Sequence, residues 1–332
     1  MTWTLVTGGT GTVGTALVFR LLRYCNAKVR VMSRDEGKLA DLKQALDAAE
    51  VPPEAYRMLV GDIRDKDRLA RAIEGVEDVF HAAALKHVDS CEYNPTETIK
   101  TNILGVQNLV DCAAAAGVKT VVNMSSDKAA APSNLMGATK LVGERLVAYA
   151  NAYGRGCRFM SVRFGNILGS RGSVLPLWRE QMRQGCIHIT DPRMTRYVMS
   201  VSDAVDLCLL AHAGRGGEIF VLKMPVVLLE NLARTVVGMW ERAHDVPPGS
   251  TRREIVGLRP GETQDETIIT ADESHRTIER DGDYVILPNI SFSDKRYAEK
   301  YGEERLKIEK NSANEPCLDV DQTCSLLRKW GL

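Results

Sequence analysis

The chain has 332 residues, of which 44% are hydrophobic and 6% are aromatic. This length can bury one large core, or a large domain that carries a smaller lobe. The 43 basic and 43 acidic residues balance, so no overall field attracts nucleic acid or anionic lipid. No segment approaches the roughly 18 uninterrupted apolar residues of a membrane span, and the N-terminus does not read as a signal peptide. We therefore expect a cytoplasmic protein that binds neither nucleic acid nor membrane.

The cysteines are scattered along the chain without a CxxC pair: Cys25, Cys91, Cys112, Cys157, Cys186, Cys208, Cys317 and Cys324. A disulfide framework or a zinc site needs tight, repeated spacing, and no histidine lies near the closest pair, Cys317 and Cys324. We expect reduced thiols and no metal site.

Short β-branched runs alternate with longer helical segments over the first two-thirds of the chain. Strands are predicted at residues 5–7, 28–32, 56–60, 79–81, 120–124 and 158–163, with a helix at 13–25 after the first. Continuous apolar strands separated by helices predict a parallel sheet that is covered on both faces. Right-handed crossovers then give an α/β fold with a doubly wound, Rossmann-type sheet.

The alternation breaks up after about Asn166, where glycine, proline and arginine become frequent. We predict a dinucleotide-binding domain at residues 1–166, to which residues 200–222 return. Residues 167–199 and 223–332 are predicted to form a smaller, substrate-binding lobe.

A glycine-rich loop joins the first predicted strand to the first helix. Gly8, Gly11 and Gly14 have the spacing GxxGxxG, which allows a tight turn, close backbone approach to a pyrophosphate and close packing of helix on strand. At the first strand–helix turn of an alternating chain, this pattern predicts a nicotinamide dinucleotide site. Its predicted contacts are Thr7, Gly8, Thr10, Gly11, Thr12 and Val13.

The end of the second strand indicates which dinucleotide binds. An acidic residue at this place suits the ribose 2′-hydroxyl of NAD, and an arginine suits the 2′-phosphate of NADP. Ser33 and Arg34 can both donate to a phosphate, although Asp35 follows them, so NADP is favoured over NAD. Asp62 and Ile63, after the third strand, are expected near the adenine; the alternative for Asp62 is a helix cap.

Polar residues follow the fifth strand at 125–128, and Met136 and Lys140 lie on the next predicted helix. The spacing i, i+4 places Met136 and Lys140 on one helical face. This arrangement resembles the active site of the extended short-chain dehydrogenase/reductases, in which a Ser or Thr acts with a YxxxK pair. The resemblance implies that Lys140 bonds the nicotinamide ribose and that Ser126 orients the reacting oxygen of the substrate.

The whole chain resembles the polysaccharide-biosynthesis branch of UDP-N-acetylglucosamine 4,6-dehydratases. Segments in chain order carry the likeness: 33–36 (SRDE), 84–88 (ALKHV), 94–95 (NP), 100–102 (KTN), 126–130 (SDKAA), 163–166 (RFGN), 170–174 (SRGSV), 191–196 (DPRMTR) and 257–262 (GLRPGE). The resemblance implies further cofactor contacts at Ala82, Ala83, Lys86 and Asn102. It implies substrate contacts at Lys86, His87, Asn166, Val174, Arg196, Arg259 and Glu262, among which the arginines can clamp a diphosphate.

Met136 departs from the family pattern, because it stands where the family tyrosine takes a proton from the sugar 4-hydroxyl. A thioether cannot take a proton. Either Asp127, Lys128 or a water relay replaces the tyrosine, or activity has been lost. Some dehydratases of this branch resemble this chain in having methionine there.

The expected reaction is an internal redox elimination. Hydride first leaves C4 for NADP⁺. Lys128, whose pKa we expect burial beside a cation to lower, then removes the C5 proton. A protonated Asp127 donates to the departing 6-hydroxyl, and hydride returns to C6. One alternative is a nucleotide-sugar 4- or 2-epimerase on the same scaffold, although a 4-epimerase needs no acid for a leaving hydroxyl. The other alternative is a non-catalytic dinucleotide sensor.

We also expect a homo-oligomer, since the apolar stripe Ile99, Ile103, Val106 and Val110 suits either core or a subunit interface.

Overall fold

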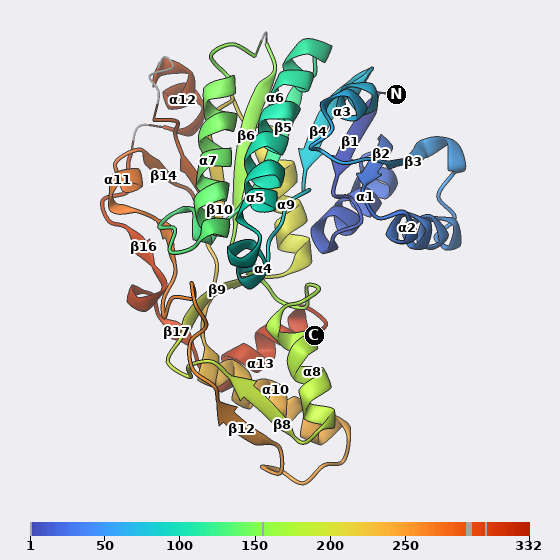
Figure 1. The fold of residues 1–332 in the computed structure, drawn as a ribbon. Helices are drawn as coiled ribbons and strands as arrows, with labels where there is room; N and C mark the ends of the chain where they lie inside the picture. Colours follow the sequence, from blue (N-terminus) through green and yellow to red (C-terminus); the bar gives the residue numbers. More distant parts are fainter. Residues whose placement is uncertain (1, 155, 290–293, 303) are drawn as a thin grey trace.

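The computed structural model describes residues 2–154, 156–289, 294–302 and 304–332 (Figure 1). Its main sheet contains β1 (Trp3–Thr7), β2 (Lys28–Ser33), β3 (Tyr56–Val60), β4 (Val76–His81), β5 (Thr120–Ser126), β6 (Arg158–Phe164), β10 (Ile219–Leu222), β14 (Thr277–Glu279) and β15 (Asp283–Ile286). The strand order is β14-β15-β10-β6-β5-β4-β1-β2-β3, and the seven strands from β10 to β3 run parallel. The predicted doubly wound sheet is therefore confirmed.

The six predicted strands are all present, and their bounds differ by a few residues. The fourth strand starts earlier, at Val76, because backbone pairing with β1 includes polar residues that hide the strand in the sequence. The fifth strand continues to Ser126, which pairs with Phe164 of β6. Ser126 is thus the last residue of a strand, and its polar side chain lies at the carboxyl edge of the sheet.

Helices cover both faces of the main sheet. One face carries α1 (Thr12–Tyr24), α2 (Glu36–Ala48) and α9 (Val201–His212), whose buried leucines, such as Leu17, Leu42 and Leu207, share one apolar core. The opposite face carries α3 (Lys66–Ile73), α6 (Gly105–Ala116) and α7 (Leu135–Ala150), which share a second core with the strands. A short helix, η1 (Pro53–Ala55), precedes β3.

The segment after Asn94 is helical but not one regular helix. It follows α4 (Val88–Tyr93) and consists of α5 (Pro95–Ile99), the π-helical η2 (Lys100–Leu104) and α6. The predicted apolar stripe divides accordingly: Val106 and Val110 are buried in the core, whereas Ile99 is 41% exposed.

A smaller lobe lies beside the carboxyl ends of the main strands (Figure 1). Its strands are β7 (Asn166–Ile167), β9 (Thr195–Met199), β11 (Val226–Leu228) and β17 (Cys317–Leu318), in the order β17-β11-β9-β7, and a separate pair, β8 (Cys186–Ile189) with β12 (Arg252–Ile255). Its helices are α8 (Val174–Arg183), α10 (Leu229–Ala243) and α13 (Val320–Lys329). Trp178, Leu232 and Leu327 belong to its apolar core.

Strands from two of the predicted segments, residues 200–222 and residues 223–332, belong to the main sheet. β10 returns to the main sheet beside β6, as predicted. However, β14 and β15 also join this sheet, because β15 pairs antiparallel with β10 and covers its apolar edge. The remaining elements are η3 (Asp127–Ala129), β13 (Thr267–Ile269), α11 (Ala271–Ser274), α12 (Asp294–Tyr301), β16 (Lys310–Asn311) and η4 (Ser312–Asn314).

The eight cysteines are all free thiols in the structure. Within the described residues, no helix is both long enough and apolar enough to cross a membrane.

Candidate active site

A cavity of about 1070 Å³ lies between the carboxyl ends of the main strands and the smaller lobe. Ligand pockets usually measure about 300–1,000 Å³, so this one lies at the upper end of that range. The glycine loop, the end of β2, the segment after β4, the end of β5, helix α7 and the lobe all contribute lining residues.

The glycine loop forms one end of this cavity. Gly8 has φ +64°, and a β-carbon built on it would lie 2.6 Å from the Ala83 backbone nitrogen. A β-carbon on Gly14 would lie 2.5 Å from the Gly8 carbonyl oxygen. The loop therefore tolerates only glycine at these two positions, and it opens onto the N-terminus of α1, a place suited to a pyrophosphate.

Five of the six predicted loop contacts line the cavity: Gly8, Thr10, Gly11, Thr12 and Val13. Thr7 does not, so that prediction is wrong. Its side chain is fully buried within the sheet, where the hydroxyl bonds Nδ1 of His81 at 2.7 Å.

Ser33 and Arg34, which the sequence predicts to contact the cofactor, line the cavity at the end of β2. The Ser33 hydroxyl bonds the Thr10 hydroxyl at 2.8 Å. Asp35 lines the cavity as well. Its carboxylate accepts from the Lys38 backbone as the N-cap of α2 and pairs with Lys38 Nζ at 2.6 Å. The hydrogen bond from Lys38 lowers the pKa of Asp35. Lys38 also lines the cavity, which adds a second cation beside Arg34.

Asp62 and Ile63 line the cavity opposite Arg34. Asp62 is not a helix cap, because Asp65 caps α3. Its carboxylate instead pairs with Arg64 at 2.7 Å and approaches Arg34 at 3.7 Å.

The segment after β4 contributes Ala82, Ala83, Lys86 and His87 to the lining, as predicted. Asn102 does not line the cavity, which corrects the expectation of a direct cofactor contact. Its side chain bonds both the backbone nitrogen and the backbone oxygen of Leu85 at 2.9 Å. Asn102 therefore holds this segment in place from behind.

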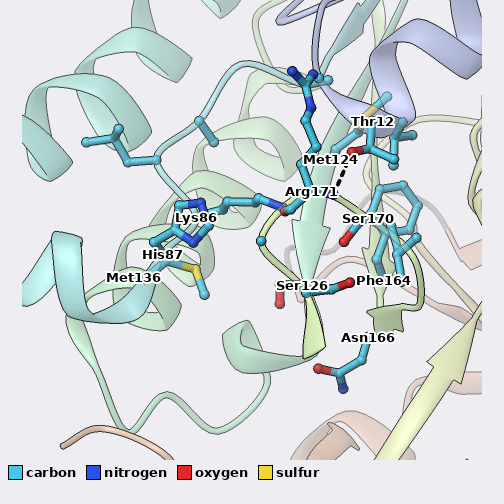
Figure 2. A pocket seen from close by; sticks show the side chains of 18 of the residues that line it. Thr12, Lys86, His87, Met124, Ser126, Met136, Phe164, Asn166, Ser170 and Arg171 are labelled. Atoms are coloured by element: carbon cyan, nitrogen blue, oxygen red, sulfur yellow. Dashed lines mark hydrogen bonds between the residues drawn. The ribbon is translucent and has the colours of Figure 1, made fainter. Parts of the chain in front are cut away.

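Arg171 also lines the cavity, although the sequence predicts no specific contact for it. Its backbone nitrogen donates to the Thr12 hydroxyl at 3.2 Å, its guanidinium donates to the Thr10 carbonyl, and its carbonyl accepts from Lys86 Nζ at 2.9 Å (Figure 2). This segment of the lobe thus crosses the cavity and fastens onto the glycine loop. Arg171 lies 159 residues from Thr12 in the chain, so no local sequence pattern predicts this contact.

Ser126, Lys128, Met136 and Lys140 line the other end of the cavity. Met136 and Lys140 lie one turn apart on α7 and face the same space, as their spacing predicts. Lys140 Nζ donates to the Met124 carbonyl at 2.7 Å, and burial lowers the pKa of Lys140 to about 8. Asp127 is 2% exposed and does not line the cavity, and the Ser126 hydroxyl donates to its Oδ1 at 2.6 Å.

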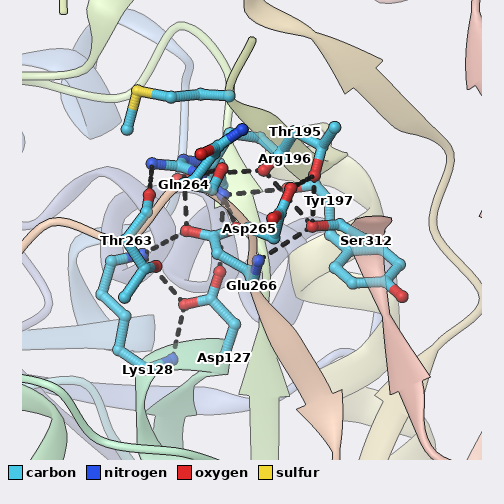
Figure 3. Close-up of polar contacts among 12 residues, drawn as sticks. Asp127, Lys128, Thr195, Arg196, Tyr197, Thr263, Gln264, Asp265, Glu266 and Ser312 are labelled. Carbon is cyan, nitrogen blue, oxygen red and sulfur yellow. Dashed lines mark hydrogen bonds and ion pairs between the residues drawn. The ribbon is translucent and has the colours of Figure 1, made fainter. Parts of the chain in front are cut away.

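The predicted charge states of Lys128 and Asp127 are wrong for this structure. Lys128 Nζ lies 3.1 Å from Asp127 Oδ1 and 2.9 Å from Glu266 Oε1 (Figure 3). Burial by itself would lower the pKa of Lys128, but these two carboxylates outweigh burial and raise it. For Asp127, burial is outweighed by Lys128 and by hydrogen bonds, so the pKa of Asp127 is lowered. The resting site holds an ammonium and an ionised Asp127.

Glu266 is the residue that the sequence reasoning missed. It reaches Lys128 from 138 positions away in the chain, and only its place four residues after Glu262 gave any signal. Asn166 Nδ2 donates to Glu266 Oε2 at 2.7 Å, and Arg196 Nε lies 3.4 Å from Oε1. Asn166 and Arg196 line the cavity, as predicted, and connect it to this buried carboxyl.

The remaining predicted substrate contacts also line the cavity: Val174, Arg259 and Glu262. Glu262 accepts from the Arg259 backbone at 3.2 Å. Between them, the Gly261 carbonyl accepts from Asn134 Nδ2 at 2.9 Å, and the same side chain caps α7 at Gly137. The arginine-bearing loop is thereby tied to the helix that carries Met136 and Lys140.

Three side chains that can ligate a metal ion lie close together on the smaller lobe. Cys186, His188 and Glu254 place ligand atoms within 4.8 Å of one another on the β8–β12 pair. The sequence does not suggest this group, because Glu254 is brought to the other two only by strand pairing.

Comparison with known proteins identifies the family. Residues 4–288 match the polysaccharide biosynthesis protein family. The chain belongs to this family. Its relatives include nucleotide-sugar dehydratases and epimerases, so the family resemblance that the motifs indicate is confirmed.

Three curated relatives illustrate the range of the family. An uncharacterized membrane protein of Methanocaldococcus jannaschii is 45% identical over 288 residues, which cover 86% of this chain and 85% of the relative. A UDP-N-acetylglucosamine 4,6-dehydratase (inverting) of Campylobacter jejuni is 41% identical over 298 residues, 88% and 84% of the two chains. A UDP-glucose 4-epimerase of Rickettsia bellii is 36% identical over 335 residues, 97% and 94% of the two chains.

Among solved structures, Pen from Bacillus thuringiensis is 36% identical and superposes with a TM-score of 0.92. The superposition covers 99% of this chain and 98% of Pen. This chain and Pen therefore share both the main sheet and the smaller lobe.

Proposed function

We propose that the protein is an NADP-dependent 4,6-dehydratase that converts UDP-N-acetylglucosamine to a UDP-4-keto-6-deoxy-N-acetylhexosamine. The observation that carries this proposal is the ammonium of Lys128, which lines the cavity between two buried carboxyl groups, beside Ser126 and Lys140. A redox step needs only a cofactor and a group that moves the hydroxyl proton. An elimination also needs a base and an acid, and Lys128 together with the two carboxyl groups can supply both.

The choice of NADP rests on the charges at the end of β2. Ser33, Arg34, Asp35 and Lys38 line the cavity there, and the Asp35 carboxylate pairs with Lys38 Nζ. A 2′-phosphate would meet two cations and a hydroxyl at this place. A bound dinucleotide supplies the hydride acceptor for C4 and the hydride that returns to C6.

Proton transfer at the sugar 4-hydroxyl can proceed without a tyrosine. The Ser126 hydroxyl lines the cavity and donates to the ionised Asp127 at 2.6 Å. A proton from the 4-hydroxyl can pass through Ser126 to Asp127, and the same path can return it to the departing 6-hydroxyl. Met136 then serves as apolar packing against the sugar or the nicotinamide, and Lys128 exchanges the proton at C5.

The diphosphate can be held by cations from separate loops. Arg196 and Arg259 line the same cavity as Asn166 and Val174. In the structure Arg196 donates to the backbone carbonyls of Thr263 and Gln264, so it is held in position before a ligand arrives. Most N–H groups of Arg196 are already used by these carbonyls, by Thr195 and by Glu266. A bidentate contact to phosphate oxygens is therefore expected from Arg259, whose side chain is half-exposed.

The test is to incubate the purified protein with NADP⁺ and UDP-N-acetylglucosamine in deuterated water. We expect loss of one water by mass spectrometry, and deuterium at C5 of a 6-deoxy-4-keto sugar by NMR. An epimer of unchanged mass would instead identify a 4- or 2-epimerase, the activity class to which a 36% identical relative belongs by name. NADP⁺ binding without turnover of any UDP-sugar would identify a non-catalytic sensor.

A further inference from the structure

The carboxyl group of Glu266 is buried directly behind Lys128. Glu266 is 5% exposed and does not line the cavity. Its Oε1 accepts from Lys128 Nζ at 2.9 Å and its Oε2 accepts from Asn166 Nδ2 at 2.7 Å (Figure 3). Both donors line the cavity, and so does Arg196, whose Nε lies 3.4 Å from Glu266 Oε1. Glu266 can therefore influence the reacting groups through these side chains.

Glu266 and Asp127 form a pair of carboxyl groups around one ammonium. Lys128 Nζ contacts both, and Asn166 Nδ2 also approaches Asp127 Oδ2 at 3.4 Å. The other charged or titratable groups that face Glu266 are Arg196 and Tyr197 of β9. Two carboxylates this close, with one ammonium and one guanidinium nearby, do not ionise independently.

The hydrogen bonds distinguish the two carboxyl groups. Asp127 Oδ1 receives three donors: the Ser126 hydroxyl at 2.6 Å, the Lys128 backbone nitrogen at 2.7 Å and Lys128 Nζ at 3.1 Å. This set stabilises Asp127 as an anion. Burial and the Asp127 charge instead raise the pKa of Glu266 to about 7. Glu266 is therefore the carboxyl group that gains and loses a proton near neutral pH.

The proposed elimination requires Lys128 to change its charge. An ammonium held by two carboxylates cannot take the C5 proton until it has released one of its own. The acceptor must be close, buried and able to hold the proton for as long as the reaction lasts. Glu266 Oε1 is close and buried, and the pKa of Glu266 lies nearer to that of Lys128 than the lowered pKa of Asp127 does, so Glu266 is the better transient acceptor. Asp127 is committed to the proton of the 4-hydroxyl.

We propose that Glu266 is a positioning residue that takes a proton from Lys128 before the elimination and returns it afterwards; this inference rests on the proposed dehydratase function. In the first transfer, an N–H bond of Lys128 breaks and an O–H bond forms on Glu266. The free amine then takes the C5 proton, the electron pair of the C5–H bond forms the C5–C6 double bond, and the 6-hydroxyl leaves with the proton that Asp127 received. Lys128 later returns a proton to C5 as hydride reaches C6. Glu266 then restores the ammonium, so no proton is gained or lost in the cycle.

The experiment compares the wild type with Glu266→Gln, Glu266→Asp and a control, Glu279→Gln. Glu279 is an exposed residue of β14 that pairs with Lys223. Turnover, C5 deuterium uptake and reduced nicotinamide are followed with UDP-N-acetylglucosamine between about pH 5 and 9. The protonated carboxyl band of the ligand-free proteins is followed by infrared spectroscopy over the same range.

In the wild type and the control, turnover should fall as the pH falls through about 7, because a protonated Glu266 cannot accept from Lys128. Glu266→Gln should lose about 10²-fold or more in turnover and lose this pH dependence. It should bind the UDP-sugar within about tenfold and accumulate reduced nicotinamide, since C4 oxidation does not use Glu266. Glu266→Asp should recover part of the rate, and the infrared band should vanish in Glu266→Gln alone.

Turnover and a pH profile in Glu266→Gln like those of the wild type would overturn the inference. A carboxyl band that persists in Glu266→Gln would assign the proton to another residue and overturn it as well. Failure of the proposed function looks different: the wild type would show the infrared band near pH 7 but release no water from the sugar, and the role of Glu266 in elimination would fall with it.

Discussion

Gly137 of α7 lies directly against the backbone of Lys128. A β-carbon built on Gly137 would come within 2.2 Å of the Lys128 carbonyl oxygen. The absence of a side chain at this position therefore allows the helix that carries Met136 and Lys140 to contact the short helix η3 that carries Asp127 and Lys128.

Replacing Gly137 by alanine should separate these two elements. We expect a loss of about 1–3 kcal/mol in the free energy of unfolding, as for other overpacked sites, together with a fall in turnover larger than the change in sugar affinity. Gly143→Ala on the same helix is the matched control, because its nearest heavy atom would be 3.6 Å away and alanine favours a helix. Urea unfolding and steady-state kinetics measure both effects. Equal tolerance of the two alanines would contradict the packing argument.

Arg34→Ala should weaken NADP⁺ binding more than NAD⁺ binding, by roughly 1.5–3 kcal/mol for one charge-assisted contact. The reason is that Arg34 lines the cavity beside Ser33, where a 2′-phosphate would lie. Titration of each cofactor against wild type, Arg34→Ala and the exposed Arg183→Ala measures the difference. An equal loss for NADP⁺ and NAD⁺ would show that another residue discriminates between them.

Lys128→Ala should abolish deuterium uptake at C5 and leave UDP-sugar binding within about tenfold. Removal of the ammonium takes away the group that exchanges the C5 proton, while Arg196 and Arg259 still line the cavity. NMR of the sugar in deuterated water follows the uptake, and calorimetry follows binding. Dehydration at a near-normal rate in this variant would remove Lys128 as the base.

Met136→Leu should keep most of the activity, because a volume-conserving apolar exchange usually costs less than about 1.5 kcal/mol and Met136 is buried. Asp127→Asn should lower turnover on the order of 10²–10⁴-fold, since the amide cannot carry the proton that passes through Ser126. The two variants are compared side by side in the same turnover assay. A Met136→Leu variant as inactive as Asp127→Asn would indicate a specific role for the thioether.

Arg163 supports the site from within the core. It is fully buried and pairs with Glu144 of α7 at 2.8 Å and with Glu273 of α11 at 2.9 Å. Arg163→Met should lower the free energy of unfolding by about 3–5 kcal/mol, because two buried carboxyl groups lose their partner. Arg20→Met, which removes an exposed pair with Asp206, should change it by less than about 1 kcal/mol.

The ion pair between Arg163 and Glu273 should make the free energy of unfolding depend on pH. Burial acts to raise the pKa of Glu273, but Arg163 outweighs it and the pKa is lowered. A carboxyl group with a lowered folded-state pKa contributes stability above its unfolded value of about 4.3, and this contribution is lost as the pH falls below that value. Urea unfolding at several pH values should therefore show a smaller loss in acid for Arg163→Met than for the wild type. Parallel curves for the two proteins would exclude Glu273 as a source of the acid sensitivity.

Local patterns in the sequence determined the sheet and the cofactor loop, and the resemblance to a family added further residues of the cavity lining. The alternation of apolar runs and helices fixes a parallel sheet, and Gly8, Gly11 and Gly14 mark its first turn, where the positions of Gly8 and Gly14 have no room for a β-carbon. Spacing i, i+4 places Met136 and Lys140 on one face of α7. These features depend on neighbours within a few residues, so the sequence displays them directly.

The tertiary structure decided which polar groups meet and which of them carry charge. Glu266 lies 138 residues from Lys128 in the chain, and no local pattern pairs them. Thr7 and Asn102 have the right chemistry for a cofactor contact, but packing turns both away from the cavity. A pKa depends on every charge and dipole within a few ångströms, whatever its place in the chain, so only the folded arrangement shows that Lys128 rests as an ammonium between two carboxyl groups.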